Sequence, residues 1–171
     1  MTGYADWVLR QNLGKSLLVD SNLFLLFVVG SYSRKTISTF KRTRDYSEAD
    51  FRDVVRIIDQ FLPLGRTLTT PHILTEVSNL AGQATGERRA GILQTLARII
   101  PRIREQTIAA ADAVATSAFV PFGLTDAVVV TMSAADCLVL TDDLPLAHRL
   151  EQDGRPVLNF NYIRIERARS R

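Results

Sequence analysis

The chain has 171 residues, of which 46% are hydrophobic and 23% charged, a composition typical of one globular domain and not of a disordered chain. The longest apolar run, residues 23–29, is much shorter than a bilayer span, so we expect no membrane segment and a cytoplasmic protein. The single cysteine, Cys137, excludes an intramolecular disulfide and, because its neighbours are apolar, is expected to be a buried thiol.

Short apolar runs alternate with segments of helical periodicity along the whole chain. In chain order, the pattern predicts a helical or irregular lead-in (1–14), a strand (17–20), a helix capped by Ser21 or Asn22 that ends near Gly30, a polar and basic loop with a short helix (31–47), a helix between Ser47 and Pro63, a strand (67–70), helices (72–83 and 87–100), an alanine-rich helical segment (107–118), a turn (120–123), a helix (124–134), a strand (137–141), a helix (144–152), a last strand (156–160) and a basic tail (161–171).

This alternation predicts an α/β fold with three layers, in which helices cover both faces of a central, mostly parallel sheet of four to five strands. Residues 137–141 are almost wholly apolar, as in a strand that is buried on both faces. We expect one domain over residues 1–171. The apolar helix 23–29 is expected in its core; a contribution to a homodimer interface is the alternative.

Several acids interrupt apolar surroundings, where a carboxylate is costly unless it is paired or bound to a metal. They are Asp20, Glu76, Asp126 and the pair Asp142 and Asp143. Each also has a purely structural explanation. Asp20 or Asp143 could cap the helix that follows, Asp126 suits the first turn of its helix, and Glu76 could edge a solvent-facing surface.

The positions of these acids indicate a shared site. Asp20 and the Asp142–Asp143 pair both follow predicted strands, and parallel strands bring their carboxyl ends to one edge of a sheet. Glu76 and Asn79 are three residues apart and share a helix face. Converging carboxylates raise one another's pKa unless a cation is present, and oxygen ligands favour Mg²⁺ or Mn²⁺.

Other kinds of site are not indicated. With one cysteine and two histidines that lack ligand spacing, a zinc site is not expected. His72 is expected in the first turn of a helix and His148 at the surface. The sequence also contains no Ser-His-Asp set, phosphate loop or glycine fingerprint.

The basic residues are mostly arginines, because only three of the 21 are lysines. Arginine binds phosphate groups with two parallel hydrogen bonds. One group lies in the loop after the first helix: Arg34, Lys35, Lys41, Arg42 and Arg44. A second lies at the C-terminus: Arg164, Arg167, Arg169 and Arg171. The groups are either solvated surface or contacts to the phosphates of a nucleic acid.

The order of these motifs resembles the PIN domain family over nearly the whole chain. The resemblance lies in Asp20 after a first strand with Asn22 two residues on, Glu76 in a central helix, Gly-Leu-Thr before Asp126, and Thr141-Asp142-Asp143 after a late apolar strand. Many PIN domains are metal-dependent ribonucleases, among them the VapC-like toxins of toxin–antitoxin pairs. Residues 31–66 form a longer segment than in the smallest of these toxins.

The resemblance implies an endoribonuclease in which Asp20, Glu76, Asp126 and Asp143 hold one or two Mg²⁺ or Mn²⁺ ions. It implies that Asp142 is a further ligand or a bystander. Asn22 and Thr141, with Asn79 as a weaker candidate, are expected to orient carboxylates or water. RNA is the implied substrate, held by Arg34, Lys35, Lys41, Arg42 and Arg44 or by the C-terminal arginines. An antitoxin protein and a second copy of the chain are the implied partners.

Three alternatives remain open at the level of sequence. One is a catalytically weak PIN-like module that binds RNA or another protein. A haloacid-dehalogenase-like phosphatase would need an Asp in place of Asn22 and a later lysine, but no lysine follows Lys41. A DNA flap nuclease would need helical extensions for which 171 residues leave little room.

Overall fold

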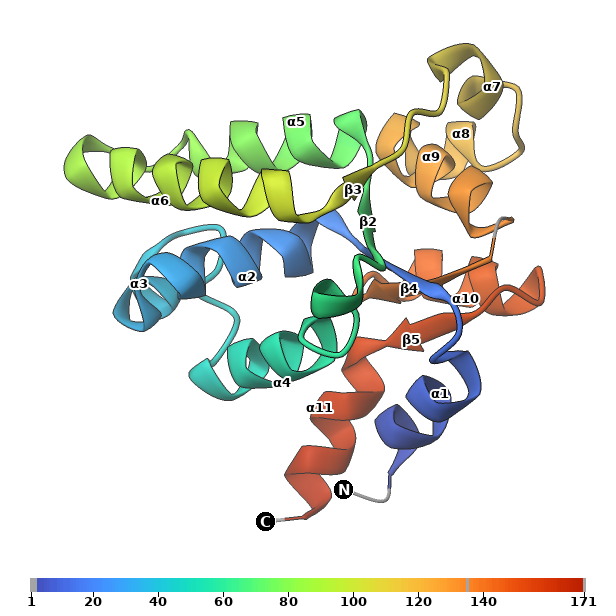
Figure 1. The fold of residues 1–171 in the computed structure, drawn as a ribbon, viewed down its shortest axis with the longest axis horizontal. Helices are drawn as coiled ribbons and strands as arrows, with labels where there is room; N and C mark the ends of the chain where they lie inside the picture. Colours follow the sequence, from blue (N-terminus) through green and yellow to red (C-terminus); the bar gives the residue numbers. More distant parts are fainter. Residues whose placement is uncertain (1–2, 135, 171) are drawn as a thin grey trace.

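The computed structural model describes residues 3–134 and 136–170 (Figure 1). Its strands are β1 (Ser16–Val19), β2 (Thr67–Thr69), β3 (Arg104–Glu105), β4 (Cys137–Thr141) and β5 (Val157–Asn159). Its α-helices are α1 (Tyr4–Asn12), α2 (Ser21–Tyr32), α3 (Arg34–Thr39), α4 (Glu48–Ile58), α5 (Pro71–Ala81), α6 (Gly86–Ile99), α7 (Ala110–Val114), α8 (Phe119–Phe122), α9 (Leu124–Ser133), α10 (Leu144–Gln152) and α11 (Phe160–Arg169). Two short 3₁₀ helices, η1 (Leu62–Leu64) and η2 (Ile100–Arg102), precede β2 and β3.

The strands form one sheet in the order β3-β2-β1-β4-β5, and every pair is parallel. The predicted α/β class with three layers is confirmed, and the sheet has the upper of the expected numbers of strands. The middle strand β1 and its neighbour β4 are almost completely buried, which explains their mostly apolar sequence.

Helices cover the sheet on both sides. In Figure 1, α2, α3 and α4 lie to the left of the strands, whereas α1, α9 and α10 lie to the right. The helix α2 is part of the core, since most of its apolar side chains are buried. The expectation that residues 23–29 form a core helix is confirmed.

Close packing around α2 depends on glycine. A Cβ atom on Gly30 would stand 2.3 Å from a ring carbon of Phe51, so the ring of α4 lies directly on the backbone of α2. The ring of Tyr32 packs in the same way on Gly91 of α6. These two contacts set how closely α4 and α6 approach α2.

Some elements differ from the sequence-based expectation. The strand β3 was not predicted, because its two residues are exposed at the sheet edge and carry no apolar alternation. The alanine-rich segment is helical only over Ala110–Val114, and the predicted turn at 120–123 overlaps the single helical turn Phe119–Phe122. Helix α2 extends two residues beyond Gly30, and its N-cap is Asp20 itself, not Ser21 or Asn22.

The C-terminal segment is a helix and not a tail. Helix α11 covers Phe160–Arg169, and two of its arginines, Arg164 and Arg167, form ion pairs with the buried carboxylate of Asp50 on α4. Arg167 also pairs with Asp53. These ion pairs hold α11 against α4. Binding of a phosphate by Arg164 or Arg167 would therefore compete with the carboxylates of α4. Arg171 lies outside the described residues.

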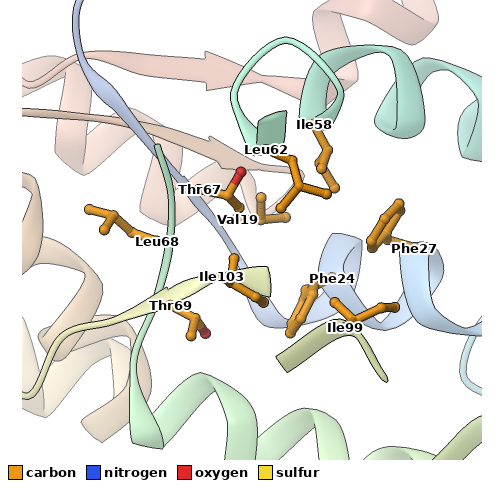
Figure 2. Close-up of a pocket in the computed structure, with 10 residues that line it drawn as sticks. All are labelled: Val19, Phe24, Phe27, Ile58, Leu62, Thr67, Leu68, Thr69, Ile99 and Ile103. Atoms are coloured by element: carbon orange, nitrogen blue, oxygen red, sulfur yellow. The ribbon is translucent and has the colours of Figure 1, made fainter. Parts of the chain in front are cut away.

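A small cavity lies inside the core between β1, β2 and α2 (Figure 2). Its volume is about 10 Å³, close to the size of one water molecule. Its lining is apolar apart from Thr67 and Thr69, whose buried hydroxyls have no hydrogen-bond partner in the structure. None of the predicted site acids lines this cavity, which is therefore a feature of the core.

Candidate active site

The order of the strands creates a switch point in the sheet, next to β1. From β1 the chain continues to β2 and β3 on one side, whereas β4 and β5 lie on the other side of β1. In open parallel sheets, ligands bind outside the carboxyl ends of the strands at such a switch point. Here the switch lies between β1 and β4, and the register pairs Val19 with Leu140. Asp20 and Thr141, the next residues on each strand, are therefore neighbours.

Asp20 is buried, with only 4% of its surface exposed, and both of its carboxylate oxygens are held by the protein. Oδ1 accepts a hydrogen bond from the backbone N–H of Ser21 at 2.6 Å, and Oδ2 accepts one from the hydroxyl of Thr141 at 2.7 Å. Burial raises the pKa of Asp20 to about 6; these hydrogen bonds oppose the rise, and the nearby charges of Asp142 and Asp143 add to it.

Glu76 is joined to the same position through Ser21. The hydroxyl of Ser21, in the first turn of α2, donates to Oε2 of Glu76 at 2.9 Å. Thr70 caps α5 through a hydrogen bond to the backbone N–H of Ile73, and this places the first turns of α5 beside the end of β1. Pro71 follows this cap as the first residue of α5, where its fixed φ suits the helix.

Asp143 is hydrogen-bonded to Thr141, the last residue of β4. The backbone N–H of Asp143 donates to the Thr141 hydroxyl at 3.0 Å, while its Oδ1 caps α10 by accepting from Leu146 at 2.8 Å. A series of hydrogen bonds thus runs from the carboxylate of Glu76 through Ser21, Asp20 and Thr141 to the backbone N–H of Asp143. The prediction that Asp20 and Asp143 could cap the following helices is also confirmed, because they are the N-caps of α2 and α10.

Asp126 contributes to the site through its charge. It lies in the first turn of α9, which contacts α5. Burial, and after it the charges of Asp20, Asp143 and Glu76, raise the pKa of Asp126 to about 7. The four acids expected at the site are therefore close enough to influence one another electrostatically.

The fit of this site to a divalent cation depends on its donors and its charge. Within residues 3–134 and 136–170, no three His, Cys, Asp or Glu side chains lie close enough together to coordinate one metal ion. The donors are nevertheless carboxylate oxygens, the ligands that Mg²⁺ and Mn²⁺ prefer. Burial is the main cause of the raised pKa values of Asp20 and Asp126, and the charges of the neighbouring acids add to it; a cation would offset both.

Asp142 has surroundings different from those of Asp143. Its Oδ2 accepts a 2.6 Å hydrogen bond from the hydroxyl of Tyr46, and the guanidinium of Arg164 stands 4.9 Å from the centre of the Tyr46 ring. Burial raises the pKa of Asp142, while the hydrogen bond from Tyr46 and the charge of Arg164 oppose the rise. Its Oδ1 is buried without a hydrogen-bond partner in the structure. Asp142 is thus held toward α11, at the margin of the site.

The two asparagines expected to support the acids differ in position. Asn22 is exposed, and in the described part of the chain it makes no hydrogen bond to any of the acids; Ser21 makes the contact instead. Asn79 lines a cleft of about 440 Å³ between α5 and the start of α9, together with Glu76 and Thr125. Asn79 thus faces the same open space as one of the acids.

The basic residues between α2 and α4 that are predicted to bind RNA are all exposed, but they lie away from the acids. Arg34 and Lys35 begin α3, beyond the far end of α2 from Asp20. Twelve helical residues separate these positions, which corresponds to about 18 Å. Lys41, Arg42 and Arg44 follow in the turn after α3, where Arg42 donates to Gln83 at 2.7 Å. A bound polynucleotide would have to span this distance over the protein surface to touch both regions.

Some residues of the site were not expected from the sequence. Ser21 bridges Asp20 and Glu76, and it could have been found as the residue that directly follows the first acid. Tyr46 had no sequence signal, and the basic cluster that contains Arg164 did not indicate this role, because the Tyr46–Asp142 and Arg164–Tyr46 contacts join segments 96 and 118 positions apart. Cys137 is buried as predicted, and burial raises the pKa of its thiol to about 11.

Comparison with known proteins does not assign the chain to a family. No helix within the described residues is both long enough and apolar enough to cross a membrane. No protein-family model matches the sequence, and no curated protein is significantly similar to it.

Proposed function

We propose that this chain is a metal-dependent endoribonuclease of the PIN type that hydrolyses phosphodiester bonds in RNA. The observation that carries the proposal is the hydrogen-bonded series Glu76–Ser21–Asp20–Thr141–Asp143 at the switch point of the sheet. Asp126 completes the set through its charge coupling to the same acids.

Asp20, Glu76, Asp126 and Asp143 would hold Mg²⁺ or Mn²⁺. Such an ion supplies Lewis acidity, which makes water more acidic and polarises the scissile phosphate. Thr141 and Ser21 keep Asp20 and Glu76 in place through hydrogen bonds. Asp20 is buried and is already held by two hydrogen-bond donors, so little entropy is lost in orienting its carboxylate when substrate binds.

The charge pattern supports RNA as a substrate. A cluster of acids repels a polyanion unless cations neutralise it, so activity requires the metal and basic side chains farther away. Arg34, Lys35, Lys41, Arg42 and Arg44 are exposed and suited to contact phosphates several nucleotides from the acids. These contacts would give affinity without reading the sequence.

The test uses purified protein and a mixed-sequence RNA with Mn²⁺ or Mg²⁺. The wild-type chain should cleave the RNA, and Asp20→Asn should lose cleavage while it keeps the same circular dichroism spectrum. Millimolar Mn²⁺ should raise the melting temperature of the wild type by mass action, and raise that of Asp20→Asn less. Full cleavage by folded Asp20→Asn would refute the assignment. A wild type that binds RNA without metal-dependent cleavage would point to a binding module instead.

A further inference from the structure

The turn that carries Asp143 is held by groups from several elements. Thr141, Asp142 and Asp143 follow one another from the end of β4 to the N-cap of α10. The backbone N–H of Asp143 donates to the Thr141 hydroxyl at 3.0 Å, and the backbone carbonyl of Asp142 accepts a 2.7 Å hydrogen bond from Nδ2 of Asn161 on α11. Because Oδ1 of Asp143 is used in the cap of α10, the backbone of this turn decides where its other oxygen points.

The side chain of Asp142 attaches the same turn to Tyr46. The Tyr46 hydroxyl, in the segment between α3 and α4, donates to Oδ2 of Asp142 at 2.6 Å. Oδ1 of Asp142 is buried and has no hydrogen-bond partner within the described residues. One oxygen is therefore already bonded and the other has no open surface. The carboxylate of Asp142 is placed to fasten the turn and not to receive a metal ion.

Tyr46 is itself fixed in place by Arg164. The guanidinium of Arg164 lies 4.9 Å from the centre of the Tyr46 ring, where a cation is attracted by the face of the ring. The same guanidinium donates two hydrogen bonds to the buried carboxylate of Asp50, from Nε at 3.2 Å and from Nη2 at 3.3 Å. A ring held in this way loses little further freedom when its hydroxyl donates to Asp142.

We propose that Tyr46 is a positioning residue of the acidic site, whose hydroxyl acts through Asp142 to fix the turn that presents Asp143 to the metal ion. The proposal rests on the nuclease function proposed above, and it assigns Asp142 as the anchor of the turn and not as a ligand. Without the Tyr46 hydroxyl, the side chain of Asp142 can rotate. The turn then no longer gives Asp143 a single orientation.

The first test needs neither metal nor activity. Tyr46→Phe keeps the ring and removes only the hydroxyl. In metal-free protein, amide hydrogen exchange followed by NMR should become about tenfold faster at Asp143 and Leu146, whose N–H groups bond within the turn and the cap. The N–H of Ile73, in the cap of α5, should exchange at the wild-type rate. Tyr162→Phe is the matched control, since Tyr162 is exposed on α11, and should leave all three rates unchanged.

The second test asks whether Tyr46 acts through Asp142. Tyr46→Phe and Asp142→Ala should each raise the Mn²⁺ concentration for half-maximal RNA cleavage about tenfold, as loss of a group that orients a metal ligand does. The double variant should be no worse than either single variant, because both remove the same contact. Asp142→Asn keeps an oxygen that can accept from Tyr46, so it should need roughly tenfold less Mn²⁺ than Asp142→Ala. Asp143→Asn, which changes the ligand itself, should lose cleavage.

The outcomes separate the two proposals. Wild-type exchange rates at Asp143 and Leu146 in Tyr46→Phe overturn the positioning role, whether or not the protein cleaves RNA. An Asp142→Asn protein as inactive as Asp143→Asn also overturns it, because Asp142 would then be a ligand. Additive losses in the double variant would show that Tyr46 does not act through Asp142. A wild type that cleaves no RNA, with faster exchange in Tyr46→Phe, overturns the nuclease and leaves the attachment of the turn to Tyr46 standing.

Discussion

Removing the charge of Asp126 should stabilise the protein although it removes a site residue. The pKa of Asp126 rises from an ordinary 3.8 to about 7, because of burial and then because of the charges on Asp20, Asp143 and Glu76. A shift of about 3 pKa units corresponds to roughly 4 kcal/mol. Asp126 keeps some contact with solvent and its charge suits the first turn of α9, so we expect a net gain of about 1–2 kcal/mol from Asp126→Asn at pH 8.

The sign of this effect depends on pH. Between about pH 4 and 7, the folded wild type binds more protons at this carboxyl than the unfolded chain does, so its stability falls as pH rises through that window. The gain from Asp126→Asn should therefore be complete at pH 8 and less than half as large at pH 5. Urea unfolding in EDTA at both pH values measures the difference directly.

Asp112→Asn is the control, because Asp112 is an exposed acid in the first turn of α7. That variant should change the free energy of unfolding by less than about 0.5 kcal/mol at either pH. A metal-free Asp126→Asn protein that is less stable than the wild type at pH 8, or equally stabilised at pH 5 and pH 8, would refute the electrostatic argument. The same variant should lose metal-dependent cleavage.

Two further predictions concern the framework around the site. Although burial opposes it, hydrogen bonds from Arg167, the backbone of Ser47 and Arg164 lower the pKa of Asp50 to about 2, so Asp50 stabilises the fold above pH 4 and this stability is lost as pH falls toward 2. Asp50→Asn should cost about 2 kcal/mol in urea unfolding at pH 7, and equal stability of variant and wild type at that pH would contradict the ion-pair argument. Gly30→Ala should lower the melting temperature and cost about 1–3 kcal/mol, because the new methyl group meets the Phe51 ring, whereas Gly14→Ala, with no atom within 4 Å, should cost nothing.

The fold was largely visible in the sequence, because the features that define it are local. The apolar run 137–141 coincides with β4, and the caps at Ser47 and Thr70 mark the starts of α4 and α5. The strand β3 was invisible, since two exposed residues at a sheet edge pair through their backbones and leave no pattern in the side chains.

The site was predictable only in part, for a similar reason. Asp20 and Asp143 stand out because each follows a buried strand. Helical periodicity places Asp50 on the polar face of α4, yet only 3% of it is exposed, because α11 packs there with Arg164 and Arg167. A contact between segments more than a hundred residues apart has no signature in a single sequence.

The order of strands in the sheet has a consequence for synthesis. Strand β1 occupies the middle of the sheet, but both of its neighbours, β2 and β4, come later in the chain. Asp20 therefore leaves the ribosome long before Thr141, the residue that holds its Oδ2. A nascent chain that stops before residue 143 contains the first acids but cannot assemble them. The two strands that carry Asp20 and Thr141 can therefore pair only after β4 has been synthesised.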